Sequence, residues 1–361
     1  MEKKIRLGII GCGVMSRHSH AYGMKDIASE AEVTAICDKR IYRAEEFCDN
    51  MGGDRSKILI TADYKEMVDV VDAVVIVTPH HLHYEQAMFF LQHDKHVLCE
   101  KPIAITEEDC LAMVAEAKKR NLTFMCAYPV PYWEGIVKLK ELLDSGKYGK
   151  VFQMSIWTEQ YTGLDRGDGE AAEWGFNRKY VGGGQFFSHG CHYVDLMLRF
   201  LGEPIKGFHM GTVTGTPWMK DMGEGTSNVV IEFEGGVLGY HFGTWGARGT
   251  THDYNIQVFT DKGFFEYDHV KNSLTYKSTL GPANETRGIT EWKFMGVGKQ
   301  TQYELLHFVD CLRTGKEPLT DGESSIQSLR AIWRMYEAEQ KGVIADLRGL
   351  GIKKEEKIIK R

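Results

Sequence analysis

The first third of the chain alternates between short apolar runs and segments with helical periodicity. Helical patterns cover residues 43–51 and 83–93, and a further helix begins at Thr106 with acidic residues in its first turn. Runs without polar alternation are typical of strands buried on both faces, and helices between them indicate a parallel, doubly wound sheet. The predicted strands cover residues 5–10, 33–37, 70–77, 96–99 and 123–127.

The pattern changes after about residue 128, where longer runs typical of antiparallel strands begin. Glu234-Gly235-Gly236 and Asp261-Lys262-Gly263 separate pairs of these runs and have the composition of hairpin turns. We therefore expect two domains, residues 1–125 with the parallel sheet and residues 126–361 with an open, mostly antiparallel sheet. The predicted strands are 151–158, 208–214, 228–233, 239–244, 255–260 and 263–268, and the predicted helices are 132–143, 301–313 and 324–339.

A glycine turn follows the first predicted strand and opens a helix. Gly11 permits the tight turn, Gly13 lets a pyrophosphate approach the backbone, and the helix start at Val14 and Met15 offers N–H groups to phosphates. Asp38 ends the second strand, near the spacing expected of an acid that binds ribose hydroxyls. A carboxylate there repels a 2′-phosphate. The pattern thus predicts a dinucleotide site that favours NAD over NADP.

A second candidate site lies at Glu100-Lys101-Pro102, where the strand 96–99 ends. Ligands of open parallel sheets bind at the carboxyl ends of strands, so we expect Lys101 to point toward the cofactor. A lysine there can polarise a substrate hydroxyl or carbonyl, and Glu100 can orient it.

Several motifs occur together in a fixed order. In that order the chain resembles the glucose–fructose oxidoreductase / inositol dehydrogenase (Gfo/Idh/MocA) family. The resemblance implies an N-terminal Rossmann domain, an open antiparallel sheet in the C-terminal domain, and NAD(P)-dependent oxidation or reduction of sugars, inositols or related polyols. It also implies that Thr78, Pro79, His83 and Glu100 lie near the cofactor. The motifs are Gly11–Met15, Thr78-Pro79 with His83, Glu100-Lys101-Pro102, Gly182-Gly183-Gly184 with Gly190-x-His192-x-x-Asp195, and a closing pattern from Tyr303 to Pro318.

The helix predicted over 182–201 carries the residue that this family commonly uses as general base, and His192 matches it. An imidazole suits proton transfer at neutral pH. Where the family often has an aspartate, four residues before this histidine, the chain has Ser188, followed by His189. A serine cannot stabilise an imidazolium as a carboxylate does. Either another acid assists, or His192 works with Lys101 alone.

Other interpretations of this segment stay open. Ser188-His189-Gly190 is similar to a Thr-His-Gly step of glycoside hydrolase family 109, whose members retain NAD and cleave glycosides by transient oxidation. His189, His192 and Asp195 lie three apart on a helix, a spacing that suits a metal, although the dinucleotide motifs explain the chain without one and we expect none. A dinucleotide-binding regulator without turnover is a third alternative. The presence of both Lys101 and His192 favours a dehydrogenase.

Further residues are expected to face the substrate. Tyr128 ends the last parallel strand, and Arg178, just before the triple glycine, can bind a substrate oxygen. With Ser188, His189 and His192 they form the predicted substrate set. An open sheet must cover its apolar outer face, which predicts a homodimer or homotetramer formed through the C-terminal sheet.

Composition excludes some classes of function. The 361 residues hold 44 Lys and Arg against 50 Asp and Glu, a net charge of −6 that argues against nucleic-acid binding. The basic run at 353–361 is interrupted by acids and is expected to be a solvated tail. No apolar run approaches the roughly 20 residues of a membrane span. The apolar run at 5–10 is a strand rather than a secretion signal, and eight scattered cysteines suggest reduced thiols, so we expect a cytoplasmic protein.

Overall fold

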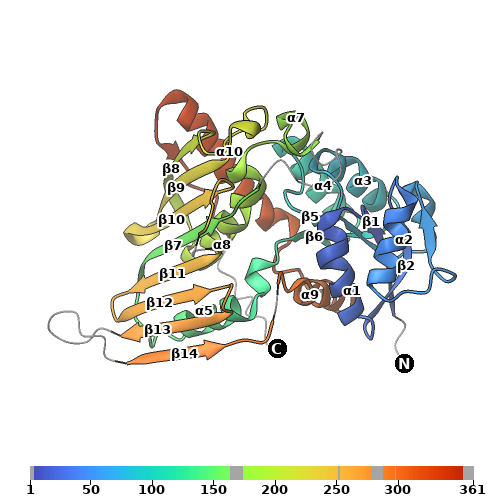
Figure 1. The fold of residues 1–361 in the computed structure, drawn as a ribbon, viewed down its shortest axis with the longest axis horizontal. Coiled ribbons are helices and arrows are strands. Elements are labelled where there is room, and N and C mark those ends of the chain that lie inside the picture. Colours follow the sequence, from blue (N-terminus) through green and yellow to red (C-terminus); the bar gives the residue numbers. More distant parts are fainter. Residues whose placement is uncertain (1–3, 163–173, 251–252, 279–287, 297, 353–361) are drawn as a thin grey trace. The chain divides into compact units, whose positions relative to one another are not determined.

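The computed structural model describes residues 4–162, 174–250, 253–278, 288–296 and 298–352, and the expected solvated tail at 353–361 lies outside them (Figure 1). The chain divides into two compact units. Unit 1 comprises Met1–Pro129, Lys179–Gly182 and Gly298–Ile326. Unit 2 comprises Val130–Arg178, Gly183–Val297 and Gln327–Arg361.

This division differs from the two contiguous domains expected from the sequence. The first boundary lies after Pro129 rather than residue 125, and the segment Gly298–Ile326 returns to unit 1. The return has a packing reason. Helix α9 (Thr301–Thr314) lies so close to α1 (Ala21–Asp26) that a Cβ on Gly23 would be 2.8 Å from Leu305. Hydrophobic periodicity shows that such a helix exists but not which sheet it covers.

Unit 1 is built on a parallel sheet of six strands in the order β3-β2-β1-β4-β5-β6. This is the strand order of a doubly wound dinucleotide-binding fold, and it confirms the predicted fold class. Only β3 was not expected, because three residues are too few to give a periodic signal. The strands are β1 (Ile5–Ile10), β2 (Ala31–Cys37), β3 (Leu59–Thr61), β4 (Ala73–Ile76), β5 (His96–Glu100) and β6 (Phe124–Ala127).

Helices join these strands, and their ends follow local chemistry. Thr106 caps α4, because its hydroxyl accepts a hydrogen bond from the amide of Asp109 at 3.2 Å, and three acidic residues occupy the first turn. The stretch after the glycine turn begins as a π-helical turn, η1. The helices of unit 1 are η1 (Ser16–His20), α1, α2 (Ile41–Asn50), η2 (Tyr64–Met67), α3 (His80–Gln92), α4 (Glu107–Lys119), α7 (Arg178–Val181, Arg178 itself belonging to unit 2) and α9.

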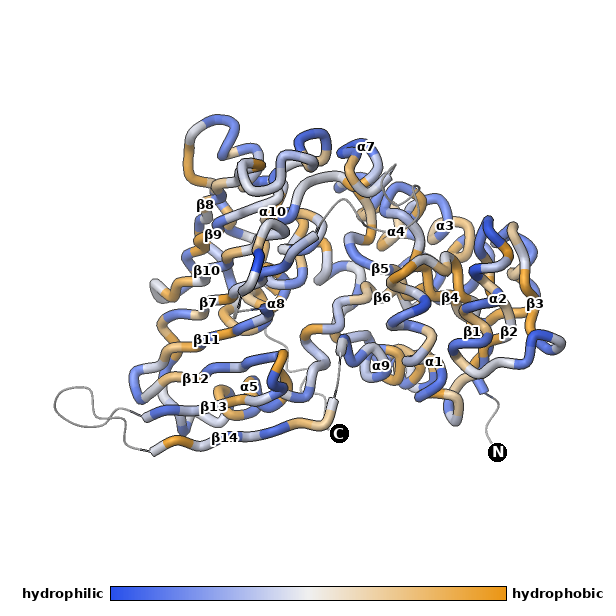
Figure 2. Tube along the Cα trace, in the orientation of Figure 1, coloured by the Kyte–Doolittle hydropathy of each residue, from blue (hydrophilic) through white to orange (hydrophobic). Residues whose placement is uncertain are grey.

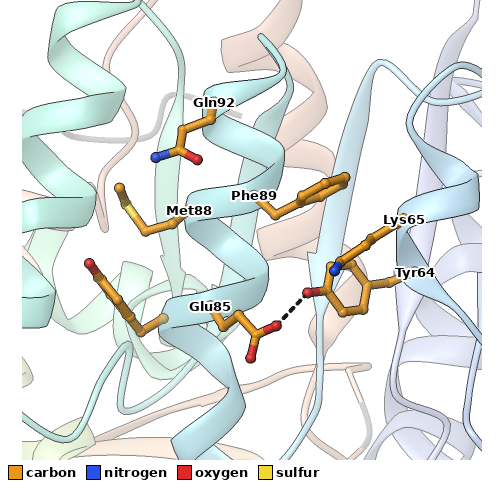
Figure 3. A pocket seen from close by; sticks show the side chains of 7 residues that line it. Tyr64, Lys65, Glu85, Met88, Phe89 and Gln92 are labelled. Atoms are coloured by element: carbon orange, nitrogen blue, oxygen red, sulfur yellow. Dashed lines mark hydrogen bonds between the residues drawn. The ribbon is translucent and has the colours of Figure 1, made fainter.

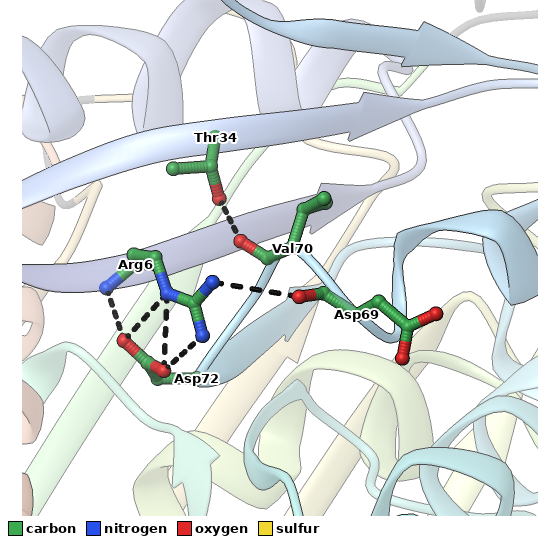
Figure 4. A network of polar contacts seen from close by, with 5 residues as sticks. All are labelled: Arg6, Thr34, Asp69, Val70 and Asp72. Carbon is green, nitrogen blue, oxygen red and sulfur yellow. Dashed lines mark hydrogen bonds and ion pairs between the residues drawn. The ribbon is translucent and has the colours of Figure 1, made fainter.

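An ion pair ties the amino ends of two central strands together (Figure 4). Arg6 of β1 donates from its backbone amide and its guanidinium to Asp72, with Nη2 2.7 Å from Oδ1. The hydroxyl of Thr34 in β2 donates to the carbonyl of Val70 at 2.7 Å. These contacts fix the edge of the sheet opposite the carboxyl ends, and so help to set the register on which the candidate site depends.

Unit 2 is built on a nine-stranded sheet in the order β14-β13-β12-β11-β7-β10-β9-β8-β15. It is mostly antiparallel, as predicted, although β7 and β10 pair in parallel. Hydropathy alternates along these strands, whereas the central strands of unit 1 are mainly apolar (Figure 2). The strands are β7 (Val151–Glu159), β8 (Pro204–Thr212), β9 (Thr226–Phe233), β10 (Val237–Thr244), β11 (Asn255–Thr260), β12 (Gly263–Asp268), β13 (Ser273–Ser278), β14 (Ile289–Lys293) and β15 (Ala345–Asp346).

Helices pack on one face of this sheet. Along β10 the small residues Gly239 and Gly243 point toward that face, where a Cβ would be 2.6 Å from Met197 and 2.2 Å from Gln185. The close approach brings α8 onto the sheet. The helices of unit 2 are η3 (Val130–Tyr132), α5 (Glu134–Asp144), η4 (Phe186–Gly190), α8 (Cys191–Leu201), η5 (Pro217–Met219), η6 (Glu234–Gly236) and most of α10 (Gly322–Lys341).

Candidate active site

The two glycines of the turn after β1 have different structural roles. Gly11 has φ +91°, and a Cβ there would lie 2.7 Å from the carbonyl oxygen of Val77, so the turn itself requires glycine. A Cβ on Gly13 would meet nothing within 4 Å. Beside it, Val14 and Met15 are 52% and 41% exposed, which is unusual for large apolar side chains at a helix start. The backbone at Gly13 is therefore open to a ligand.

Asp38 joins this turn from the end of β2. Its Oδ2 accepts a hydrogen bond from the amide of Cys12 at 2.7 Å, and its Oδ1 accepts one from the amide of Arg40 at 2.9 Å. A carboxylate has about four acceptor positions, so both oxygens can still accept hydroxyl groups. The residues present thus fit a dinucleotide: an open glycine backbone, the free amides of a helix start, and an acid for the ribose.

The loops after β4 and β5 are held together by His83. Its ring nitrogens lie 2.8 Å from the carbonyl oxygen of Thr78 and 2.9 Å from that of Pro102. Burial lowers the pKa of His83, and the side chain has no exposed surface. Thr78 also donates its hydroxyl to Gln86 at 2.6 Å. His83 therefore positions the loop of Thr78 and Pro79, which the resemblance places near the cofactor.

Glu100 and Lys101 lie at the carboxyl end of β5. Glu100 accepts a hydrogen bond from the backbone amide of Lys101 at 3.1 Å and from Nε2 of His20 at 2.9 Å. Burial raises the pKa of Glu100, but the hydrogen bond and charge of His20 and the charge of Lys101 outweigh it and lower that pKa to about 2. Glu100 is thus an ionised neighbour of Lys101. His20 was missed from the sequence, because nothing in the local pattern links η1 to β5.

In unit 2, Gly183 and Gly184 precede the turn η4, which leads into α8. This segment packs closely against β10 and against Glu224 in the loop before β9. A Cβ on Gly184 would be 2.3 Å from the carbonyl oxygen of Glu224, and the amide of Phe186 donates to Oε1 of Glu224 at 2.9 Å. Ser188 donates its hydroxyl to the carbonyl oxygen of Gly183 at 3.3 Å. Ser188 therefore has a local backbone contact where the family often has a carboxylate.

His189 and His192 lie in an aromatic cluster of unit 2. The ring of His189 is 5.7 Å from that of His192, 5.5 Å from Tyr193, 5.8 Å from Tyr254 and 6.4 Å from Trp245. His192 is 7% exposed, and His189 is half-buried. The sequence indicated the two histidines but not Tyr193, Tyr254 and Trp245, whose aromatic character is equally typical of a core.

Asp253 supplies a further acid to this cluster. One of its oxygens is buried without a hydrogen-bond partner among the described residues, and its charge acts on the Tyr193 hydroxyl, which is itself buried and unpartnered there. Burial and the charge of Glu159 raise the pKa of Asp253 to about 6. The sequence did not indicate this residue, because an aspartate in a turn is ordinarily solvated.

The remaining candidate of the helix 182–201, Asp195, has a structural partner. Asp195 is fully buried and accepts hydrogen bonds from Nε and Nη2 of Arg199 at 2.6 and 2.9 Å. It is therefore engaged in an ion pair rather than presented with His189 and His192 as a ligand. Within the ranges that the structure describes, no three His, Cys, Asp or Glu side chains are grouped to hold a metal ion.

Two further expected substrate residues, Tyr128 and Arg178, differ in exposure. Tyr128 has no exposed surface. Its position at the end of the buried strand β6 is the reason. Arg178 is exposed, with its guanidinium 5.9 Å from the ring centre of Tyr336.

A surface hollow of about 310 Å³ lies along α3 and contains none of the candidate residues (Figure 3). The hydroxyl of Tyr64 donates to Glu85 across it at 2.9 Å. It is lined by Tyr64, Lys65, Tyr84, Glu85, Met88, Phe89 and Gln92. In the described part of the chain, no helix has the length and apolar character to cross a membrane.

The chain is similar to known dehydrogenases over most of its length. It is 26% identical over 333 residues to a myo-inositol 2-dehydrogenase of Thermotoga maritima, which covers 90% of this chain and 93% of that protein. An uncharacterised oxidoreductase of Streptococcus pneumoniae is 30% identical over 202 residues, which span 55% of this chain and half of that protein. A solved levoglucosan dehydrogenase in complex with NADH and L-sorbose has the same fold, with a TM-score of 0.83 at 20% identity over 97% of this chain and the whole of that one.

Two family models match consecutive parts of the chain. Residues 5–128 match the oxidoreductase family with an NAD-binding Rossmann fold, and residues 136–266 match the C-terminal domain of the same family. These two segments include the glycine turn, Asp38, Lys101 and His192. The chain therefore belongs to the GFO/IDH/MocA family of NAD-binding oxidoreductases.

Proposed function

We propose that this protein is an NAD-dependent dehydrogenase that oxidises a CH–OH group of a sugar, a cyclitol or a related polyol. The observation that carries the proposal is the open backbone at Gly13 beside the carboxylate of Asp38, in a member of this family. Because Asp38 would repel a 2′-phosphate, it favours NAD over NADP. Asp38 is expected to bind the ribose hydroxyls, and the amides of Gly13, Val14 and Met15 the pyrophosphate.

The reaction requires one hydride acceptor and one proton acceptor. Bound NAD would supply the hydride acceptor for the carbinol carbon. His192 takes the hydroxyl proton, so that the alcohol becomes a carbonyl and the imidazole an imidazolium. Lys101 donates a hydrogen bond to the reacting oxygen and stabilises its developing negative charge. Glu100, whose pKa is lowered by His20 and Lys101, adjoins Lys101 in the chain.

The aromatic cluster around His189 provides the substrate surface in this proposal. The ring of Tyr254 offers an apolar face to the C–H side of a sugar ring, while His189 and Asp253 bind hydroxyl groups. Asp253 is the acid whose charge acts on Tyr193 in this cluster, where Ser188 replaces the aspartate common in the family. The proposal assigns no role to Tyr128, which has no exposed surface.

Substitution of the two catalytic candidates tests the mechanism. Lys101→Met and His192→Asn should each lower kcat by roughly 100-fold or more, because general acid–base groups typically contribute that much. NADH binding, followed by fluorescence titration, should stay within about threefold, since neither substitution alters the glycine turn. Turnover would be followed by NADH formation on a panel of sugars and inositols.

The outcomes separate the alternatives. Wild-type turnover in both variants would overturn the assigned roles. Cleavage of an aryl glycoside without net NADH would favour the redox glycosidase, and NADH binding without turnover of any substrate would favour a regulator.

We also propose that the outer face of the unit 2 sheet forms a homodimer or a homotetramer. Cross-strand neighbours on that face are apolar and exposed, with Phe208 opposite Val230 and Val230 opposite Tyr240. Phe208, Met210, Val230 and Leu238 are each 40–59% exposed. An exposed apolar sheet face of this kind is typical of an interface. The eight cysteines are buried, and buried thiols fit a reducing compartment such as the cytoplasm.

A further inference from the structure

Several buried polar atoms of unit 1 have no partner. They are Oγ of Ser16, Nδ1 of His20 and both carboxyl oxygens of Glu304, which make no hydrogen bond within the described residues. All three side chains have no exposed surface. Buried polar atoms are nearly always paired, with protein or with ordered water.

The elements that carry these atoms face one another. The hydroxyl of Thr301 in α9 donates to the carbonyl oxygen of Ser19 at 3.1 Å. Leu305 of the same helix packs against Gly23 of α1. Glu304 lies between these two contact points of α9, one turn after Thr301, so its side chain faces η1 and α1. Ser16 and His20 are four positions apart in η1 and so lie on the same side of it.

The charges in this region keep Glu304 neutral. Burial and the nearby charge of Glu100 raise the pKa of Glu304 well above its usual value, and Lys299 opposes this only in part. A neutral carboxylic acid donates one hydrogen bond and accepts others. The charged groups that act on Glu304 are Glu100 at the end of β5 and Lys299 before α9.

Ordered internal water is the usual partner of buried polar atoms that the protein itself leaves unpaired. A buried water typically makes about three hydrogen bonds to groups that would otherwise be unpaired. The hydroxyl of Ser16, the ring nitrogen of His20 and the acid of Glu304 together supply both donors and acceptors. Three separate unpaired groups meeting by chance in one packed interface would each destabilise the fold without compensation.

We propose that Ser16, His20 and Glu304 bind internal water, and that Glu304 is a positioning residue for the reaction. Through this water Glu304 holds the ring of His20, whose other nitrogen donates to Glu100 at 2.9 Å. Glu100 in turn accepts from the amide of Lys101 at 3.1 Å. Glu304 thereby fixes the carboxylate next to Lys101. Its effect on turnover rests on the proposed dehydrogenase function, but the water itself does not.

The proposed water site can be tested without measuring enzymatic activity. A crystal structure of the full chain that resolves ordered solvent should show water within hydrogen-bond distance of Ser16 Oγ, His20 Nδ1 and Glu304. In ¹⁵N NMR of the histidine rings, Nδ1 of His20 should carry a hydrogen bond in the wild type and in Glu304→Gln, and lose it in Glu304→Leu. A dry cluster, or an unchanged His20 signal in Glu304→Leu, would overturn the proposal.

Kinetics then test the positioning role. Glu304→Leu should lower kcat by roughly tenfold and shift the pH profile of kcat/KM, because the charge beside Lys101 is no longer held in place. Glu304→Gln keeps a donor and an acceptor and should retain the wild-type profile. An equal loss in both variants, or a loss in Glu304→Leu with an unchanged profile, would contradict the role. If the wild type oxidises no polyol, the proposed function fails, and the solvent and NMR results still decide the water site.

Discussion

At the scale of single residues, the candidate site depends on how two neighbouring glycines differ. Gly11 is required by the backbone, since its φ is +91° and Val77 closes the space above it. Gly13 is not required by the fold, since the space where a side chain would lie is empty. In a glycine turn between a strand and a helix start, such open space lets a pyrophosphate approach the backbone.

Gly13→Ala therefore separates binding from stability. We expect the melting temperature to stay within about 2 °C of the wild type, while the Kd for NADH rises roughly tenfold or more, because the new methyl group occupies the approach of the pyrophosphate. Thermal denaturation and fluorescence titration measure the two effects. Gly215→Ala, in an exposed loop of unit 2 with equally open space, is the control and should change neither quantity.

Gly11→Ala tests the folding role of the first glycine of the turn. That substitution should destabilise the protein by roughly 1–3 kcal/mol, because a side chain at this φ is strained and meets Val77. Unchanged NADH affinity in Gly13→Ala would contradict the assignment of the turn as the dinucleotide site.

At the scale of elements, the sequence predicted most of the strands and helices but not how they assemble. Strands β11 and β12 agree with their predicted bounds, because apolar alternation and a two-residue turn define a hairpin locally. Strands β13 and β14 were missed, since their half-polar, half-exposed residues give no clear alternation. The parallel pairing of β7 with β10 and the return of α9 to unit 1 depend on contacts between distant segments.

The residues of the candidate site also divide into those that the sequence predicted and those that it did not. Gly11, Gly13 and Asp38 follow from short spacings that one fold imposes. His20 and Glu304 could not be found in this way, because each acquires its significance from an element far away in the chain. The sheet of unit 2 brings Tyr254 and Trp245 close to His189, and Asp253 close to Tyr193. No local sequence pattern predicts these contacts.

The exposed face of the sheet in unit 2 gives a prediction at this scale. Val230→Lys places a charge in the centre of the row formed by Phe208, Val230 and Tyr240, so it should dissociate the oligomer, as measured by sedimentation or by light scattering after gel filtration. Val270→Lys is the matched control, because Val270 is exposed in a turn outside the strands. A wild-type protein that is already monomeric, or an unchanged assembly in Val230→Lys, would refute an interface on this face.

At the scale of the whole molecule, the proposed reaction needs one contribution from each unit. Unit 1 carries the glycine turn, Asp38 and Lys101, and unit 2 carries His192 and the aromatic cluster. Both units carry residues that the proposed reaction uses, so its tests are made on the full chain.

The transfer of deuterium from substrate to cofactor tests this central claim most directly. A polyol from the active panel, deuterated at the carbinol carbon, would be incubated with the protein and NAD, and the nucleotide analysed by mass spectrometry. The account predicts one deuterium on the nicotinamide ring per carbonyl formed, with the rate of labelling falling by roughly 100-fold or more in Lys101→Met and His192→Asn. A carbonyl product with unlabelled nucleotide, or equal labelling in the wild type and both variants, would contradict it.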